Sequence, residues 1–173
     1  MIEYDIAYKH LGLDVGDKKI IVELSLDNMM GEKTFSATSN LLFFDSDETW
    51  GHACGVGETE HDALNMCINE IENYTNSNVD TNMVYETDLP KRLTFVYKKE
   101  TVILYFKKVD NEYILLTSQG IIKIPNELDL IKYIDKNAKK LSKLGIKQYS
   151  KEYFQNHKFE ELFENMTEKY HGI

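Results

Sequence analysis

Two runs of alternating polar and apolar residues, each followed by an amphipathic helical pattern, set the strongest limit on the fold of this 173-residue chain. The alternation is clearest where Val22, Leu24 and Leu26 are separated by acidic and hydroxyl side chains, as in a half-buried strand. The first predicted strand lies at the start of the run, and we expect it at an edge of the sheet. The predicted strands of this first run are residues 2–8, 19–27, 33–44 and 50–56.

A helix is predicted directly after the first run of strands. Thr59 is a good N-cap, and the acids Glu60 and Asp62 suit the positive end of the helix dipole. A polar stretch over residues 73–80 ends the pattern and is the best candidate for a linker. The apolar stripe of this helix comprises Ala63, Leu64, Cys67, Ile68, Ile71 and Tyr74.

The second run repeats this order of strands and helix. Residues 93–97, 101–108 and 113–117 predict a three-stranded meander, and residues 121–124 predict a short fourth strand. Two C-terminal helices follow, the first with Leu128, Ile131, Ile134, Ala138 and Leu141 and the second with Phe159, Leu162, Phe163, Met166 and Tyr170. The fold class is therefore α+β, mainly antiparallel sheet with one helix after the first strands and two at the C-terminus. The halves, residues 1–75 and 83–173, form either two units or a single domain over 1–173.

Charge divides the chain in the same place. Residues 1–90 hold 18 acids and four lysines, a net charge of −14, whereas residues 91–173 hold 11 acids and 16 basic residues, a net charge of +5. This split indicates two faces with different partners or two self-complementary lobes, unless the halves interleave and their fields average out. Arg92 is the only arginine among 20 basic residues. This usage suits an AT-rich genome of a low-GC bacterium or its phage, and it equips the chain poorly for base-specific readout.

Composition excludes several classes of protein. Two cysteines cannot form a disulfide scaffold, and no apolar run approaches the length of a membrane span. The first residues have neither the basic nor the apolar region of a secretory signal, so we expect a cytoplasmic protein without membrane contact. We find no phosphate-binding loop and no nucleophile elbow, and the sequence predicts no cofactor. The oligomeric state stays open.

Histidine and cysteine residues near the first helix allow an enzymatic alternative. His52 and Cys54 share one face of the predicted strand over residues 50–56, and His61 follows in the helix, so Cys54 with either histidine is a candidate thiolate–imidazole pair. Neighbouring acids would raise the pKa of such a thiol rather than lower it. Cys67 belongs to the apolar stripe and the chain has no Cys-x-x-Cys, so we predict no metal site.

The junction between the predicted strand over residues 50–56 and the first helix resembles a segment of two known families. The segment Gly55-Val56-Gly57-Glu58-Thr59-Glu60-His61-Asp62-Ala63-Leu64 is similar to the strand-to-helix junction of double-stranded-RNA-binding domains and of HicB-like antitoxins. The resemblance covers about ten residues and implies a helix packed on a sheet. Glu60 and His61 stand where the RNA-binding family has two lysines that contact phosphates. The acids there argue against RNA binding at this site.

A lysine-rich segment over residues 127–147 offers a second alternative. Its lysines lie opposite the apolar stripe of the predicted helix and could contact phosphates through electrostatics alone. They could equally be a solvated surface, because neither arginine nor stacking aromatic residues are interleaved with them. The candidate phosphate contacts are Lys132, Lys136, Lys139, Lys140, Lys143 and Lys147.

The leading hypothesis is a non-enzymatic protein-binding module. Spaced carboxylates on a folded surface can imitate a phosphate backbone and occupy a basic nucleic-acid channel. By analogy of composition, we expect a phage or mobile-element accessory protein of the anti-CRISPR or anti-restriction type, which inhibits a basic nucleic-acid-handling host protein. The candidate partner contacts are Asp45, Asp47, Glu48, Glu58, Glu60 and Asp62, with Trp50 as an aromatic anchor.

Overall fold

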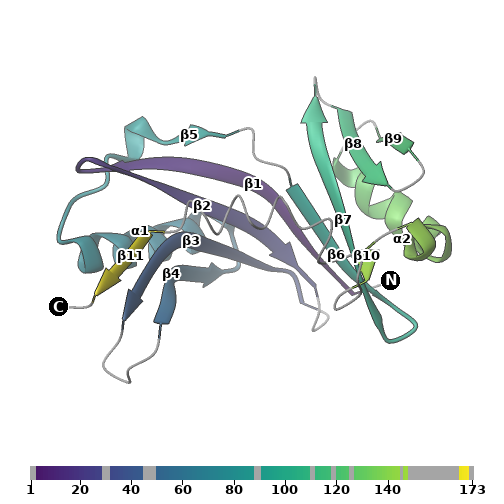
Figure 1. Cartoon of the computed structure of the whole chain (residues 1–173), viewed down its shortest axis with the longest axis horizontal. Coiled ribbons are helices and arrows are strands. Elements are labelled where there is room, and N and C mark those ends of the chain that lie inside the picture. The colour runs from purple at the N-terminus through teal and green to yellow at the C-terminus, as the bar shows by residue number, and fades with distance from the viewer. Residues whose placement is uncertain are drawn as a thin grey trace.

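One sheet runs through the whole fold, in the order β11-β3-β2-β1-β6-β7-β8-β9 (Figure 1). In addition β4 pairs with β3, β5 with β1 and β10 with β7, and all pairs are antiparallel except β11–β3. This computed structural model describes residues 3–28, 32–44, 50–87, 91–109, 112–117, 120–124, 127–144, 146–147 and 168–171. The elements are β1 (Tyr4–Val15), β2 (Lys18–Asp27), β3 (Thr34–Phe44), β4 (Trp50–Gly57), α1 (Glu60–Thr75), the 3-10 turn η1 (Thr81–Met83), β5 (Tyr85–Glu86), β6 (Lys91–Tyr97), β7 (Glu100–Val109), β8 (Glu112–Thr117), β9 (Gly120–Ile124), α2 (Glu127–Leu144), β10 (Ile146–Lys147) and β11 (Glu168–His171).

The hairpin of β1 and β2 is the centre of the sheet. Its two-residue turn contains Gly16, whose φ of 63° lies in the left-handed region that glycine adopts without strain. On its other side β1 pairs first with β6 and then, at Leu11 and Gly12, with β5. The prediction of an edge strand over residues 2–8 is therefore wrong. The strand is longer than its alternation indicated, because a bulge between Ala7 and Lys9 interrupts the pattern.

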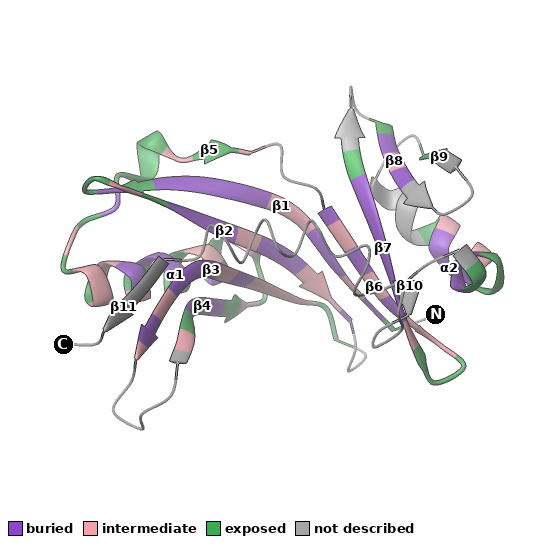
Figure 2. Ribbon diagram, viewed as in Figure 1, coloured by how far each residue is buried: buried purple, intermediate pink, exposed green. Residues whose placement is uncertain are grey.

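Both helices lie against the same face of the sheet. Ile6 stands opposite Leu26 on β2 and Leu93 on β6, so these three side chains point to one face, which is also that of Leu24. Tyr8 packs against the apolar clusters beneath both helices. Figure 2 shows the buried stretches along β1, β2 and β7. The α1 cluster includes Leu13, Ile20, Val22, Leu24, Leu41, Ala63, Cys67 and Ile71, and the α2 cluster includes Ile6, Leu93, Phe95, Leu104, Phe106, Ile134, Ala138 and Leu141.

The first helix begins and ends as its sequence predicts. The Thr59 side chain accepts a hydrogen bond from the Asp62 N–H at 3.1 Å, and Asn76 ends α1 in the left-handed conformation. A Cβ atom on Gly55 of β4 would overlap the carbonyl oxygen of Ala63. Only glycine therefore permits this close approach of strand and helix, and the junction has the sheet-plus-helix layout that the resemblance implied.

The remaining strands and α2 confirm the predicted meander and helix. The predicted last helix falls largely on residues outside the described part of the chain. Its final member, Tyr170, lies in β11, which pairs in parallel with β3, so the helical prediction is wrong at that residue. The described residues form a mostly antiparallel sheet with two helices, which fits the α+β class. Whether residues 1–75 and 83–173 fold separately stays a prediction.

Candidate functional site

Among the described residues, β4 pairs with β3 on one side only and is an edge strand. Ala53 and Gly55 are buried beneath α1, whereas His52, Cys54 and Val56 are exposed on the opposite face. The sequence predicted this shared face. The Trp50 side chain lies outside what the structure describes.

His52 donates a hydrogen bond to a backbone carbonyl where the pairing of β3 with β4 is irregular. The register between β3 and β4 shifts between Thr38 and Leu42, and the carbonyl of Ser39 lies within this shift. The His52 Nδ1 is 2.7 Å from that carbonyl oxygen, so Nδ1 carries the proton and donates it. This contact gives His52 a structural role.

Cys54 lacks the surroundings of a reactive thiolate. Partial burial and the nearby Glu70 carboxylate raise the pKa of its thiol, in the direction that the sequence indicated. His61 on α1 instead contacts the Asn65 side chain, at 2.9 Å. Burial raises the pKa of Cys67 to about 12, and its thiol donates to the Ala53 carbonyl oxygen. Within the described ranges, no group of three or more His, Cys, Asp or Glu side chains could hold a metal ion.

The predicted acidic contacts divide into three groups. Asp45, Asp47 and Glu48 lie outside the described residues, in the connection from β3 to β4. Glu58 and Asp62 are exposed at the start of α1. Glu60 is only partly exposed and is engaged within the fold, where its carboxylate accepts a 2.6 Å hydrogen bond from Tyr8 and lies 3.5 Å from the Lys9 ammonium.

Exposed lysines form a stripe along α2. They lie opposite the buried Ile134, Ala138 and Leu141, as the helical spacing predicts. Lys147, which the sequence grouped with them, lies in β10 beyond the end of the helix, and its side chain is not described. The exposed members of the stripe are Lys132, Lys136, Lys139, Lys140 and Lys143.

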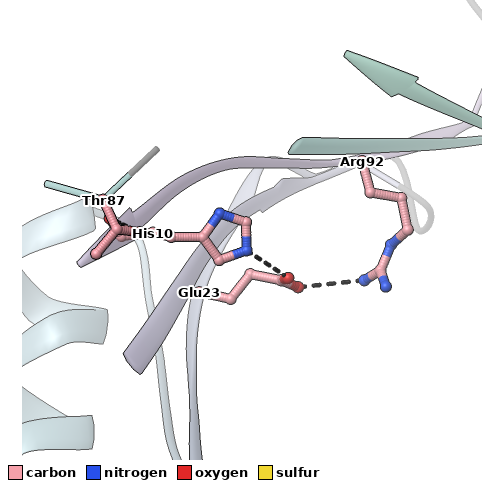
Figure 3. Close-up of polar contacts among 4 residues, drawn as sticks. All are labelled: His10, Glu23, Thr87 and Arg92. Atoms are coloured by element: carbon pink, nitrogen blue, oxygen red, sulfur yellow. Dashed lines mark hydrogen bonds and ion pairs between the residues drawn. The ribbon is translucent and has the colours of Figure 1, made fainter. Parts of the chain in front are cut away.

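A partly buried ionic bridge, which sequence reasoning missed, connects β1, β2 and β6 (Figure 3). Glu23 accepts from the Nε2 of His10 at 3.0 Å and from the Arg92 guanidinium at 3.1 Å. Burial alone would raise the pKa of Glu23, but the His10 hydrogen bond and the Arg92 charge together lower it. The carboxylate is therefore held ionised between two donors.

Asp5 lies on the same face of the sheet, opposite Asp27 on β2. Burial raises the pKa of Asp5 to about 6 against the lowering effect of Arg92, and the charges of Asp27 and Glu23 raise it further. Its Oδ1 atom is buried and lacks a hydrogen-bond partner. One face of the central sheet thus carries two carboxyls whose pKa values are shifted in opposite directions.

The signal that could have found this bridge is the solitary arginine. Arg92 stands opposite Ala7, which stands opposite Ser25, so its side chain crosses a small residue of β1 to reach Glu23 on β2. Sequence alone gives neither the register nor the bulge that brings residues 69 positions apart into contact.

No protein-family model, no curated protein and no solved structure matches this chain. Neither described helix combines the length and the apolar character that crossing a membrane requires. The geometry of the residues themselves therefore carries the functional argument.

Proposed function

We propose that the protein is a non-enzymatic binding module that presents an acidic surface around β4 and α1 to a basic partner. The observation that carries this proposal is the absence of lysine and arginine from residues 34–90, which hold 11 acids. These residues include all of β3, β4, α1, η1 and β5. Glu58 and Asp62 are exposed beside β4, so part of the negative charge faces outward.

The largest group of exposed lysines among the described residues lies elsewhere on the sheet. The lysine stripe lies on α2, at the end of the sheet opposite α1 (Figure 1). Ion pairs between the halves, Arg92 with Glu23 and Lys91 with Glu86, lie at the junction around β1 and β6. This arrangement supports a bipolar charge distribution rather than an averaged one.

The partner that fits such a surface is a basic nucleic-acid-handling protein. Carboxylates at spaced positions can occupy a channel built for phosphates and exclude the nucleic acid. We place the module in the cytoplasm, as an accessory protein of a phage or mobile element that inhibits a host protein. The raised pKa of the Cys54 thiol and the structural hydrogen bond of His52 favour binding over catalysis at β4.

Charge reversal tests the proposal. The triple variant Asp45→Lys, Asp47→Lys, Glu48→Lys should lose capture of a basic nuclease from a low-GC bacterial lysate, while the wild type captures it and releases it to excess duplex DNA. Asp14→Lys with Asp17→Lys, at the exposed turn of β1 and β2, is the matched control and should retain capture. Equal capture by the wild type and the triple variant would contradict the acidic surface.

The lysine stripe supports a second candidate function, direct binding to a phosphate backbone. Five lysines are exposed on one side of α2, opposite its buried face. Binding of this kind should weaken steeply with salt and fall in a Lys136→Glu, Lys140→Glu variant. Absence of a mobility shift with DNA or RNA at about 50 mM salt would remove this candidate, because non-specific binding is strongest at low salt.

A further inference from the structure

We propose that β4 is a docking strand, and that an extended basic segment of the partner adds as a further β-strand to the edge that no described strand covers. This inference rests on the proposed function, because it specifies how the acidic surface holds its partner. Main-chain hydrogen bonds would supply affinity, and side-chain contacts on both faces of the strand would supply selectivity.

Backbone direction is the first support. The Cys54 N–H donates to the Glu70 carboxylate at 2.8 Å and not to β3, so it is directed away from the strand that pairs with β4. Amide groups two residues apart along a strand point to the same side. The N–H of Val56 is therefore directed to the open edge as well.

Apolar surface beside this edge is the second support. Val56 is 53% exposed and Met66 is 51% exposed, and both are among the few large apolar side chains that the described surface leaves open. Val56 projects from the face of β4 away from α1. Met66 reaches the strand from α1, since a Cβ atom on Gly55 would lie 2.8 Å from the Met66 Cβ. An added strand would meet apolar surface on both of its faces.

Charge identifies the occupant. Glu58 and Asp62 are exposed directly after β4, and the Glu70 carboxylate lies beside its outer edge. A second copy of this chain would bring equal charges together along the edge, which costs free energy. A lysine- or arginine-bearing segment would instead be attracted to these carboxylates.

Glu70 makes the edge selective. Its carboxylate covers the Cys54 N–H, and such covered edges resist pairing with arbitrary chains. An incoming strand has to replace this contact. A lysine in that strand can pair with the released carboxylate, whereas a neutral strand leaves the charge without compensation. The Glu70 contact therefore favours basic segments over neutral ones.

The direct test uses a labelled eight-residue peptide that alternates lysine with valine, with blocked ends, and measures fluorescence anisotropy. Wild-type protein should bind it, and the N–H groups of Cys54 and Val56 should gain protection from hydrogen exchange. Val56→Pro, which removes one outward N–H, should lower affinity about tenfold. Val56→Thr keeps that N–H and should change affinity less than about threefold. Glu70→Gln should reduce the preference for the lysine peptide over a serine–valine peptide.

A second arm does not depend on the folding of any variant. The same lysine–valine peptide, N-methylated at every residue, keeps every charge but has no N–H on either edge to form a ladder. Loss of its binding supports the docking strand. Equal binding of methylated and unmethylated peptides overturns it.

The two proposals fail in different ways. If methylation has no effect but the Asp45→Lys, Asp47→Lys, Glu48→Lys variant loses the peptide, the acidic surface stands and the docking strand falls. If that triple variant also binds normally, the proposed function falls too. Self-association in sedimentation that Val56→Pro abolishes would assign the edge to a second copy and overturn the basic occupant.

Discussion

The two helices pack on the sheet in the same way, but their exposed surfaces carry opposite charges. Both cover the same face, and each buries a stripe that includes an alanine and several aliphatic side chains. Outward, α1 has acids in its first turn and neither lysine nor arginine, whereas α2 carries the lysine stripe. Because packing dictates only the inward side chains, the outward charge is free to serve binding. The difference between the halves therefore bears on function more than on fold.

The largest effects on stability are expected from substitutions in the two apolar clusters. Ile71→Ala on the buried face of α1 and Phe95→Ala on β6 beneath α2 each remove a fully buried side chain, at 0% exposure. Each should lower the free energy of unfolding by about 2–5 kcal/mol through lost burial and a residual cavity. Because β1 pairs with strands of both halves, we expect both variants to shift one common transition.

Urea denaturation with two probes checks this expectation. Fluorescence of Trp50, the only tryptophan, reports on the α1 half, and far-ultraviolet circular dichroism reports on the whole chain. Coincident curves indicate one cooperative unit. If Phe95→Ala shifted the dichroism and left the fluorescence curve unmoved, residues 1–75 and 83–173 would be separate domains.

Removing the ionic bridge should have the next largest effect. Glu23→Gln leaves His10 and Arg92 facing an amide and should cost about 1–3 kcal/mol. The lowered pKa of Glu23 means that its contribution to stability is present above its unfolded pKa and is lost as pH falls through the folded value. The variant should therefore lose stability at neutral pH and vary less than the wild type below about pH 4. Thermal unfolding across pH measures both effects, and an unchanged acid limb would show that Glu23 is not held ionised.

Asp5→Asn should act in the opposite direction. Asp5 has a raised pKa, so its ionisation destabilises the fold increasingly as pH rises from 3.8 to about 6 and fully above that. Allowing for partial exposure, the variant should gain about 1–2 kcal/mol at pH 8 and almost nothing at pH 3. A titration of Asp5 by carbon NMR gives the pKa directly, and a value near 4 would contradict the shift.

The sequence predicted the features that depend on local pattern. Strand alternation, the Thr59 cap and the buried stripe of α1 need only neighbouring residues, and the structure confirms them. The features it missed depend on register. Its edge placement of residues 2–8 failed because β6, more than 80 residues later in the chain, pairs with them. The Glu23–Arg92 contact required the same pairing, and the use of His52 at a β-bulge required the shift between β3 and β4. Pairing between distant strands cannot be read from periodicity.

The smallest expected effects on stability come from two charge reversals, which distinguish local from long-range electrostatics. Asp62 lies in the first turn of α1, where its charge suits the helix dipole, so Asp62→Lys should cost about 0.3–1 kcal/mol. Lys136 lies in the middle of α2 and is exposed, so Lys136→Glu should change the free energy of unfolding by less than about 0.5 kcal/mol. Both substitutions change the net charge by two, in opposite directions. If the halves form one bipolar field, the free energy of unfolding should change by a common amount in both variants at low salt, and this shared change should vanish near 1 M salt. At physiological salt, the interaction of Asp62 with the helix dipole should account for most of the remaining difference between the variants. Equal and opposite effects for the two variants would show that net charge, and not position on the helix, sets the stability of this fold.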